Sequence, residues 1–439
     1  MAKEHASHGD AAIVRLADGT VKQKNLLTGT EVWTVPGRGN RPLTKQTEAP
    51  RPLDPSTHGH HCAFCEGRYF ETPPEKSRLV VDEGGAWHQL DALPADQLLA
   101  TTAQFRRIPN LFEIVSYNYW HLNHGHVPSE AEHRRMAEYL ASDTGYDHVM
   151  KLVHTRMAAG GMDEDEFAAM SDSEKLQHAN GFFSGGHDVI VARRHFVDGA
   201  TDDSQLASSG TLTPEEHFHY VNFTADSMAD LYGLDPAVRY VAAFQNWLKP
   251  AGASFDHLHK QLVAIDEHSV QTEAELSRLR QDPDLYADIL RVAATRRLVL
   301  AQNDHAIAMA GFGHRYPTIA VWPTGRPLNP WEVDDEAMRG VSDILHAMHA
   351  ATGVDVPCNE EWYHRPPDVS TPMRWRILLK WRVSTIAGFE GGTRIYLNTL
   401  DPWAVWNRMM PRLQEMRDAG TIAPMRLGEE CRVDADLLG

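Results

Sequence analysis

Three polar side chains alternate along one short stretch of this 439-residue chain, namely His257, His259 and Gln261. On a β-strand, alternate side chains project to the same face, so these three would form a ladder on one side. The intervening residues would point to the other side: Leu258, Lys260 and Leu262. A solvated strand face could carry the same pattern. However, the glycine turn at 252–254 leads into the stretch and lets backbone N–H groups approach a phosphate, which favours a site.

Two of the four cysteines form a Cys-x-x-Cys pair, Cys62 and Cys65. Four cysteines are too few for a disulfide framework, and the N-terminus shows no secretion signal, so the pair favours metal or redox chemistry. Free thiols are the alternative. The neighbouring histidines could also act as ligands: His58, His60 and His61.

The surrounding sequence predicts two successive groups of strands and helices. The first has strands at 188–192, 238–244 and 255–265, and a helix from Pro214, capped by Thr213 and ended near Tyr232 by Gly233. The second has strands at 298–309, 318–322, 373–383 and 394–397, and a helix at 335–351. A hairpin near residues 26–35, helical segments at 130–180 and 267–295, and a closing helix at 402–418 complete the chain. The order predicts an α+β fold with antiparallel sheets, packed helices and an internal duplication.

The segment around the polar ladder resembles the active-site motif of galactose-1-phosphate uridylyltransferases and related nucleotide phosphorylases. These enzymes form a branch of the histidine-triad superfamily. They carry G-x-S, two residues, then H-P-H-x-Q, and here Leu258 replaces the proline. The resemblance implies that His259 is the nucleophile and that Gln261 and Ser254 assist it. It also implies two histidine-triad-like repeats.

Other motifs of the same family follow in the same order along the chain. They are Asn25–Pro42 with its Arg-x-x-Arg-Pro, Cys62–Gly67, Thr72–Glu75, Pro109–Phe112 and Gly186–His195. By this resemblance Arg38 and Arg41 contact the nucleotide phosphates and Asn110 lines the nucleoside pocket. Asn246 lies where the family places a phosphate-contacting asparagine.

The resemblance also implies a metal site. In the family, the two cysteines, the histidine after the later strand and the first histidine of the ladder bind zinc, here Cys62, Cys65, His195 and His257. Two thiolates and two imidazoles form a closed tetrahedral set, which is typical of structural zinc. We therefore expect one structural zinc per chain, bound two residues from the nucleophile.

The predicted domains are an N-terminal nucleotidyltransferase repeat at 1–270, with the zinc site, the nucleophile and a helical insertion at about 130–180, and a degenerate C-terminal repeat at 271–439 that contributes to acceptor binding. Many uridylyltransferases have a second His-x-His, with a further metal, on the corresponding strand of that repeat. Here the strand has no histidine, so no second metal is expected. Its cations could hold a phosphate or form a solvated face: Arg374, Arg376 and Lys380.

The predicted function is transfer of a nucleoside monophosphate between phosphorylated compounds through a nucleotidyl-histidine. The substrates would be a nucleotide sugar or dinucleotide and a phosphorylated acceptor, with the base open. A phosphorylase or hydrolase of dinucleoside polyphosphates or nucleotide sugars is the alternative within the superfamily. A non-catalytic zinc sensor and a thiol redox enzyme are alternatives from other classes.

Composition limits the partners. The formal net charge of −18 argues against broad nucleic-acid binding, which needs a basic face. With 42% apolar and 23% charged residues the chain is ordinary for a globular protein, and no apolar run is long enough for a membrane span. We expect a cytoplasmic protein, and the resemblance adds the expectation of a homodimer.

Overall fold

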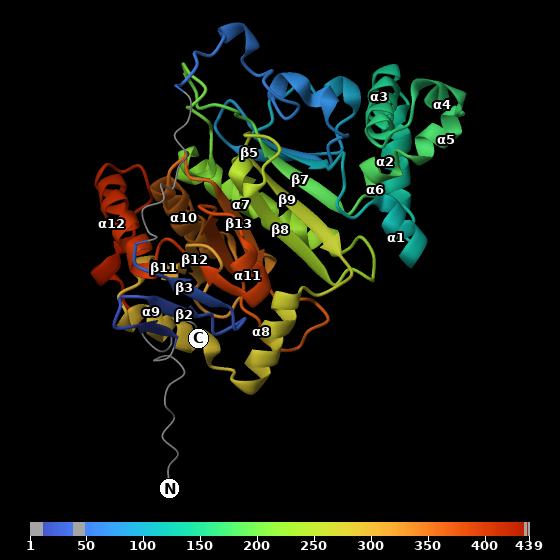
Figure 1. Cartoon of the computed structure of the whole chain (residues 1–439). Helices are drawn as coiled ribbons and strands as arrows, with labels where there is room; N and C mark the ends of the chain where they lie inside the picture. The colour runs from blue at the N-terminus through green and yellow to red at the C-terminus, as the bar shows by residue number, and fades with distance from the viewer. Residues whose placement is uncertain (1–11, 38–48, 434–436, 438–439) are drawn as a thin grey trace.

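A computed structural model describes residues 12–37, 49–433 and 437, and its main feature is one twelve-stranded antiparallel sheet (Figure 1). Across the sheet the strands are β16 (Arg426–Leu427), β10 (Val299–Gln302), β11 (Ala306–Gly311), β12 (Thr318–Pro323), β14 (Arg376–Trp381), β13 (Cys358–Tyr363), β8 (Tyr240–Trp247), β9 (His259–Ile265), β7 (His187–Ala192), β6 (Phe105–Pro109), β4 (Ser77–Val81) and β5 (Trp87–Asp91). The α+β fold with antiparallel strands is confirmed.

The strand order is symmetric about the β8–β13 contact. Outward from that contact, one half runs β8, β9, β7, β6, β4, β5 and the other runs β13, β14, β12, β11, β10, β16. In each half a long helix precedes the central strand, α7 (Pro214–Leu231) before β8 and α10 (Asp335–Thr352) before β13. The order gives β14 the place in its half that β9 has in the other.

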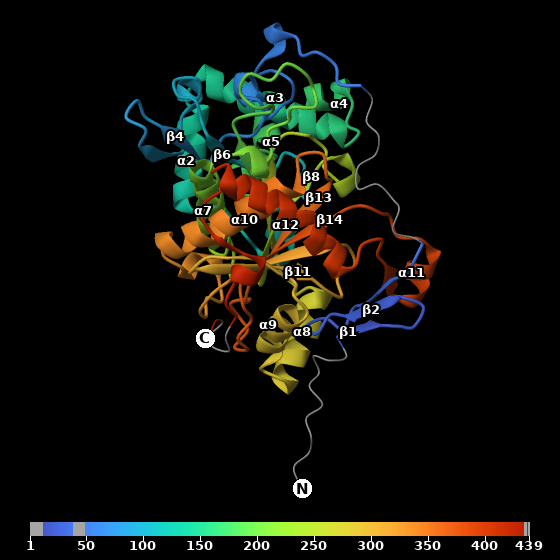
Figure 2. The ribbon, with the colours of Figure 1, turned by 90° about the vertical axis from the view of Figure 1, so that its left-hand side faces the viewer.

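Three long helices cover one face of this sheet, and the helix at 285–295 packs on the other face at β11 and β12. Helix α7 packs against α10, and α10 and α12 (Pro402–Asp418) pack against β11 and β12. Figure 2 brings α10 and α12 to the front of this layer. The main apolar core lies between these helices and the sheet. We call the other side of the sheet the open face. None of the described helices is both long and apolar enough to cross a bilayer.

Smaller elements flank the sheet. Helices α1 (Tyr117–His124), α2 (Glu130–Leu140), α3 (Asp143–Ala159), α4 (Glu164–Ala169), α5 (Asp172–Gln177) and α6 (Asn180–Ser184) gather at one side of the molecule (Figure 1). A second sheet joins β1 (Ile13–Arg15), β2 (Val21–Lys24), β3 (Glu31–Thr34) and β15 (Ile395–Leu397). The remaining helices are α8 (Val270–Gln281), α9 (Leu285–Thr295) and α11 (Gly388–Thr393).

Helix boundaries follow the local signals in the sequence. Thr213 caps α7 through a capping box with Glu216, and Pro214 occupies the first turn, as expected. The predicted closing helix coincides with α12. It keeps its regular course although Pro411 lies inside it.

Two strand predictions need correction, and one strand was not predicted. The segment predicted at 298–309 is divided into β10 and β11. Strand β9 begins at His259, four residues later than predicted, because 254–257 form a bend. Strand β13 was not predicted, because it carries Glu360 and Glu361 on opposite faces, and such charges disfavour a strand in isolation.

Candidate active site and metal centre

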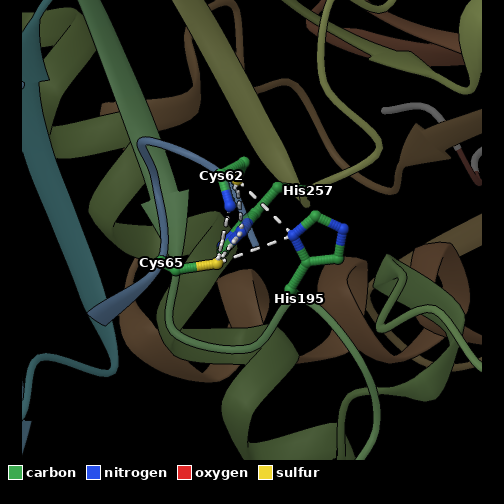
Figure 3. Close-up of side chains that lie close together, drawn as sticks. All are labelled: Cys62, Cys65, His195 and His257. Carbon is green, nitrogen blue, oxygen red and sulfur yellow. Dashed lines mark hydrogen bonds between the residues drawn. The ribbon is translucent and has the colours of Figure 1, made fainter. Parts of the chain in front are cut away.

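Four side chains from three distant parts of the chain meet beside the sheet: Cys62, Cys65, His195 and His257 (Figure 3). Their ligand atoms all lie within 4.8 Å of one another. The Sγ atoms of the two cysteines are 3.8 Å apart, and His195 Nδ1 lies 3.5 and 3.6 Å from them. His257 Nδ1 lies 3.4 and 3.8 Å from the same atoms. These are the four metal ligands predicted from the sequence.

These separations suit a tetrahedral zinc ion. Zinc bonds of about 2.3 Å to sulfur and about 2.0–2.1 Å to nitrogen place two sulfurs ~3.8 Å apart and a sulfur and a nitrogen ~3.6 Å apart. The hydrogen bond between the thiols lowers the pKa of Cys65 and raises that of Cys62, which favours one thiolate. The chemistry and the spacing of the donors therefore fit zinc, and the cluster could bind such a metal.

The chain around the cluster explains how the four ligands meet. The two cysteines lie in the loop before a short 3-10 helix at 66–71, and His195 lies three residues past the end of β7. His257 lies in the bend before β9, and its Nε2–H donates to the Ala192 carbonyl at 2.7 Å. That bond leaves Nδ1 as the unprotonated atom facing the sulfurs, which is the usual partner arrangement of a histidine ligand.

His259, the predicted nucleophile, is oriented by the same bend. Its Nδ1–H donates to the carbonyl of His257 at 2.7 Å. Burial lowers the pKa of the imidazole to about 4. The ring is therefore neutral near pH 7, with its lone pair on Nε2. Within the described residues, no hydrogen-bond partner meets this Nε2.

Phe64, between the two cysteines, covers this imidazole. Its ring centroid lies 5.1 Å from that of His259 and 6.0 Å from that of His257. It also packs on an apolar cluster of the open face formed by Ile108, Val189 and Val191. The metal loop thus supplies an apolar wall next to the histidine. Phe64 was not predicted as a site residue, although it lies within the Cys62–Gly67 motif.

Gln261 is held by a buried histidine that sequence analysis did not single out. His187 Nδ1 accepts the backbone N–H of Ile114 at 3.0 Å, so Nε2 carries the proton and donates to Gln261 Oε1 at 3.1 Å. Burial lowers the pKa of His187 to about 4, in accord with this neutral form. The amide NH₂ of Gln261 is therefore left to donate. Asn110 Nδ2 lies 3.0 Å from the same Nε2, a close approach of two N–H groups and not a hydrogen bond in this tautomer, so this predicted residue is near the site.

Asn246 is oriented from the other half of the sheet. Arg382 donates to Asn359 Oδ1 at 2.6 Å, and Asn359 Nδ2 donates to Asn246 Oδ1 at 2.7 Å. These two hydrogen bonds leave the NH₂ group of Asn246 free to donate. It faces the turn at Gly252, whose φ of +92° lies in the left-handed region that favours glycine.

The sheet register places Asn246 beside the predicted nucleophile. Phe244 pairs with Gln261, so the next open-face positions on β8 and β9 are Asn246 and His259. Ser254 is exposed in the bend before β9. Arg38 and Arg41 lie outside the described residues. The metal cluster does not include the neighbouring histidines, and the ring of His61 packs against His195 and Phe196 instead.

On the helix-covered face of the sheet, beneath the site, the side chains form a buried charge network. Lys260 projects to the helix-covered side, as predicted, and forms a fully buried ion pair with Glu360 of β13. His349 of α10 contacts the same carboxylate at 2.7 Å. The two halves are therefore linked by buried charges under the site, a pairing that local sequence does not reveal.

The open face also carries two adjoining hollows. One of about 570 Å³ lies over β8 and β13 and includes Asn246 and Phe244. The other, of about 320 Å³, lies over β13 and β14 and extends to the hairpin at residues 25–30. They share walls, and together we call them the groove. The shared residues are Gln271, Asn359, Glu361, Tyr363 and Arg382.

Solved structures share this architecture. An ADP-glucose phosphorylase from Arabidopsis thaliana, solved with bound ADP-glucose, is similar with a TM-score of 0.57 and 18% identity over 89% of this chain and 98% of that chain. A GalT-like protein from the same plant gives a TM-score of 0.55 and 18% identity, with the same coverage. The fold is thus that of these GalT-like structures.

Sequence comparison defines the family. Residues 16–439 match the family described as "Domain of unknown function (DUF4921)", and the chain belongs to that family. An ADP-glucose phosphorylase of Arabidopsis thaliana is 25% identical over 179 residues, which is 38% of this chain and 50% of the relative. The match thus spans about half the length of that relative.

Proposed function

We propose that this chain transfers a nucleoside monophosphate between phosphorylated compounds, with His259 as the nucleophile. The observation that carries the proposal is the orientation of the imidazole. Its Nδ1–H is held by the His257 carbonyl, which leaves Nε2 as the nucleophilic atom beside two amide donors, Gln261 and Asn246. The similarity to an ADP-glucose phosphorylase supports a nucleotide-sugar substrate.

The reaction needs no external proton in its first step. His259 Nε2 attacks the α-phosphorus, the N–P bond forms, and the bond from phosphorus to the bridging oxygen breaks. The leaving phosphate takes the electron pair. In the second step an oxygen of the acceptor phosphate attacks the phosphorus, and the N–P pair returns to Nε2. This sequence predicts ping-pong kinetics.

Catalysis in this scheme depends on positioning and charge stabilisation. The NH₂ groups of Gln261 and Asn246 would donate to non-bridging oxygens. The Nδ1–H bond to the carbonyl favours the positive charge that the ring develops on attack. The apolar surface of Phe64, with Val189 and Val191, would exclude water and accept the nucleoside. Ser254 and the backbone after Gly252 would donate to the same phosphate, and Asn110 would border the base.

The proposed zinc is structural. Cys62, Cys65, His195 and His257 would hold it, and when bound it supplies rigidity to the bend. The chain's own contribution is the link between this bend and the nucleophile, because the carbonyl that fixes His259 belongs to the ligand His257. We assign the acceptor side to the C-terminal repeat at 271–439, whose strands β13 and β14 line the groove.

Phosphorolysis is the second candidate. The curated relative and one solved structure are ADP-glucose phosphorylases, which favours inorganic phosphate as the acceptor over a hexose phosphate and adenine as the base over uracil. Both reactions proceed through the same intermediate. The acceptor alone separates them.

The decisive experiment is intact-mass analysis after incubation with ADP-glucose, UDP-glucose, GDP-glucose and diadenosine tetraphosphate. We expect an adduct with the mass of one nucleoside monophosphate, which identifies the base. Adding inorganic phosphate or glucose 1-phosphate to the isolated adduct then identifies the acceptor by the product released.

The matched variants are His259→Ala and His88→Ala, the second on the exposed strand β5 at the other end of this half. We expect the adduct to disappear in the first and to persist in the second. An adduct that persists in a folded His259→Ala protein would overturn the assignment. If zinc-loaded wild-type protein acquires no adduct from any donor, the sensor reading is favoured instead.

A further inference from the structure

The far end of the groove is unusually cationic for an acidic protein. The hollow of about 320 Å³ has four cations in its wall, Arg315, Arg376, Lys380 and Arg382, and one carboxylate among its described residues, Glu361. The chain as a whole has a formal charge of −18. Such a local excess of positive charge in an acidic protein selects for an anion.

Two of these cations are neutralised and two are not. Arg376 forms a buried ion pair with Glu275 of α8, and Lys380 pairs with Glu361. Within the described residues, no carboxylate lies within ion-pair distance of Arg315 or Arg382. The hollow therefore retains two guanidinium groups without an ion-pair partner among the described residues, although Glu361 still acts on Arg382 at longer range.

Aromatic rings hold these two groups in place. Arg382 lies over the ring of Tyr316 at 4.7 Å, and Arg315 lies 5.0 Å from the same ring and 5.6 Å from that of Tyr396. The Nε atom of Arg382 is buried and without a hydrogen-bond partner. A guanidinium that is stacked and only partly satisfied is pre-organised to bind an oxyanion.

The sheet register connects this hollow with the nucleophile. Lys380 pairs with Asn359, and Asn359 pairs with Asn246, so that these three lie in one row on the open face. His259 occupies the next open-face position of β9. Strands β9 and β14 are three strand spacings apart, or ~14 Å. A molecule with a phosphate at His259 can therefore extend along the groove toward Arg315.

We propose that the phosphorylated compound exchanging with the nucleotide on His259 carries a second anionic group, bound by Arg315 and Arg382. This inference rests on the proposed function and deepens it by naming the class of the acceptor, or of the equivalent leaving group. The class is a bis-anionic compound such as a sugar bisphosphate. A sugar monophosphate, with a neutral distal end, would leave both guanidinium groups unpaired.

The test uses discharge of the isolated nucleotide adduct by glucose 1,6-bisphosphate and by glucose 1-phosphate. We expect a higher kcat/KM for the bisphosphate with wild-type protein. In Arg315→Gln the ratio of the two kcat/KM values falls about tenfold, which corresponds to one charge-assisted hydrogen bond. Arg382→Gln lowers it similarly, whereas Arg382→Lys retains part of the preference. Arg291→Gln, an exposed arginine on α9, serves as the matched control and keeps the wild-type ratio.

A bisphosphate no better than the monophosphate, with the same ratio in Arg315→Gln, would overturn the proposal. Calorimetric binding of both compounds separates this result from failure of the proposed function, because binding needs no adduct. If wild-type protein forms no adduct but binds the bisphosphate at least tenfold more tightly than Arg315→Gln does, the subsite stands and the nucleotidyl chemistry is wrong. Equal binding to both proteins rejects the subsite.

Discussion

Strands β9 and β14 have corresponding places in the two halves of the sheet, but they are braced in different ways. The bend before β9 is held by a Cys₂His₂ cluster that could bind a metal, and the strand begins with a neutral histidine. Strand β14 begins with Arg376, whose guanidinium is neutralised by Glu275 of α8 inside the protein. Tyr286 of α9 donates to the same carboxylate at 2.5 Å.

The difference suits the two halves of the sheet to different tasks, chemistry in one half and stability and binding in the other. A closed metal site restrains the bend without occupying the open face, so a reactive lone pair can remain beside it. A buried ion pair restrains a strand equally well, but both of its charges are consumed. We infer that the first half keeps the chemistry and that the second half provides stability and binding surface.

Loss of the metal cluster should have the largest effect. We predict that Cys65→Ser loses zinc and loses on the order of 5 kcal/mol in stability. Adduct formation should slow by at least about 100-fold, because the remaining ligands become mobile, and with them the His257 carbonyl that orients His259. Zinc content by plasma mass spectrometry, thermal unfolding and adduct mass measure these effects. Wild-type protein should contain one zinc per chain.

The matched control is Cys431→Ser, which replaces a half-buried thiol outside the cluster. It should retain zinc, stability and adduct formation. If a Cys65→Ser protein forms the adduct at the wild-type rate, the metal cluster before β9 is not needed for the chemistry. The proposed difference between the cluster and the Arg376–Glu275 ion pair of β14 would then be wrong.

Loss of the Arg376–Glu275 ion pair at β14 should lower stability and leave the nucleophile His259 unaffected. Arg376→Met leaves Glu275 as an uncompensated buried charge, and we predict a loss of about 3–5 kcal/mol in unfolding free energy. The double variant Arg376→Met, Glu275→Leu should recover most of that loss, since both charges are removed. Urea unfolding measures both. A larger loss in the double variant would contradict this account.

The local sequence was sufficient for much of the first half. The four residues of the metal cluster, the α7 cap and the face of Lys260 could all be predicted, because colinear motifs and strand alternation are encoded along the chain. Strand β13 could not, because Glu360 and Glu361 become compatible with a sheet only when Lys260 and Lys380 approach from neighbouring strands.

The supporting contacts of the site were also beyond sequence reasoning. His187 appeared only inside the Gly186–His195 motif, and its role depends on Gln261 lying on the adjacent strand β9. The orientation of Asn246 depends on Asn359 and Arg382, more than 100 residues away. Such contacts arise from strand pairing between distant segments. The predicted roles of Arg38 and Arg41 stay predictions.

The two halves also differ in the pKa of a buried glutamate. Glu113, beside α6, has its Oε1 without a partner, while its Oε2 accepts the backbone N–H of Tyr117 at 3.2 Å and lies 4.0 Å from Arg156. Burial raises its pKa to about 7. In the second half, burial would raise the pKa of Glu361 as well, but its ion pair with Lys380 lowers it.

Stability should therefore depend on the protonation of Glu113. Between pH ~4.5 and ~7 the unfolded chain releases this proton while the folded protein keeps it, so stability falls as pH rises, by at most about 3 kcal/mol. Glu113→Gln should remove this decline. Urea unfolding at several pH values measures it. A difference between variant and wild type that does not change with pH would contradict the prediction.

The smallest expected effect concerns Gln261, which would assist the nucleophile without bonding to phosphorus. Gln261→Ala removes one donor to the transferring phosphate, and we predict that kcat falls about tenfold to 100-fold, or ~1.4–2.7 kcal/mol, with KM for the nucleotide donor nearly unchanged. Gln89→Ala, on the exposed strand β5, is the control. His187→Phe should lower kcat in the same direction, because it removes the group that leaves the Gln261 NH₂ free to donate. An effect of Gln261→Ala on KM alone would mean that the amide binds the ground state and the transition state equally. Gln261 would then contribute to binding only, the role proposed here for the second half of the sheet. The division of tasks between β9 and β14 would be less sharp than proposed.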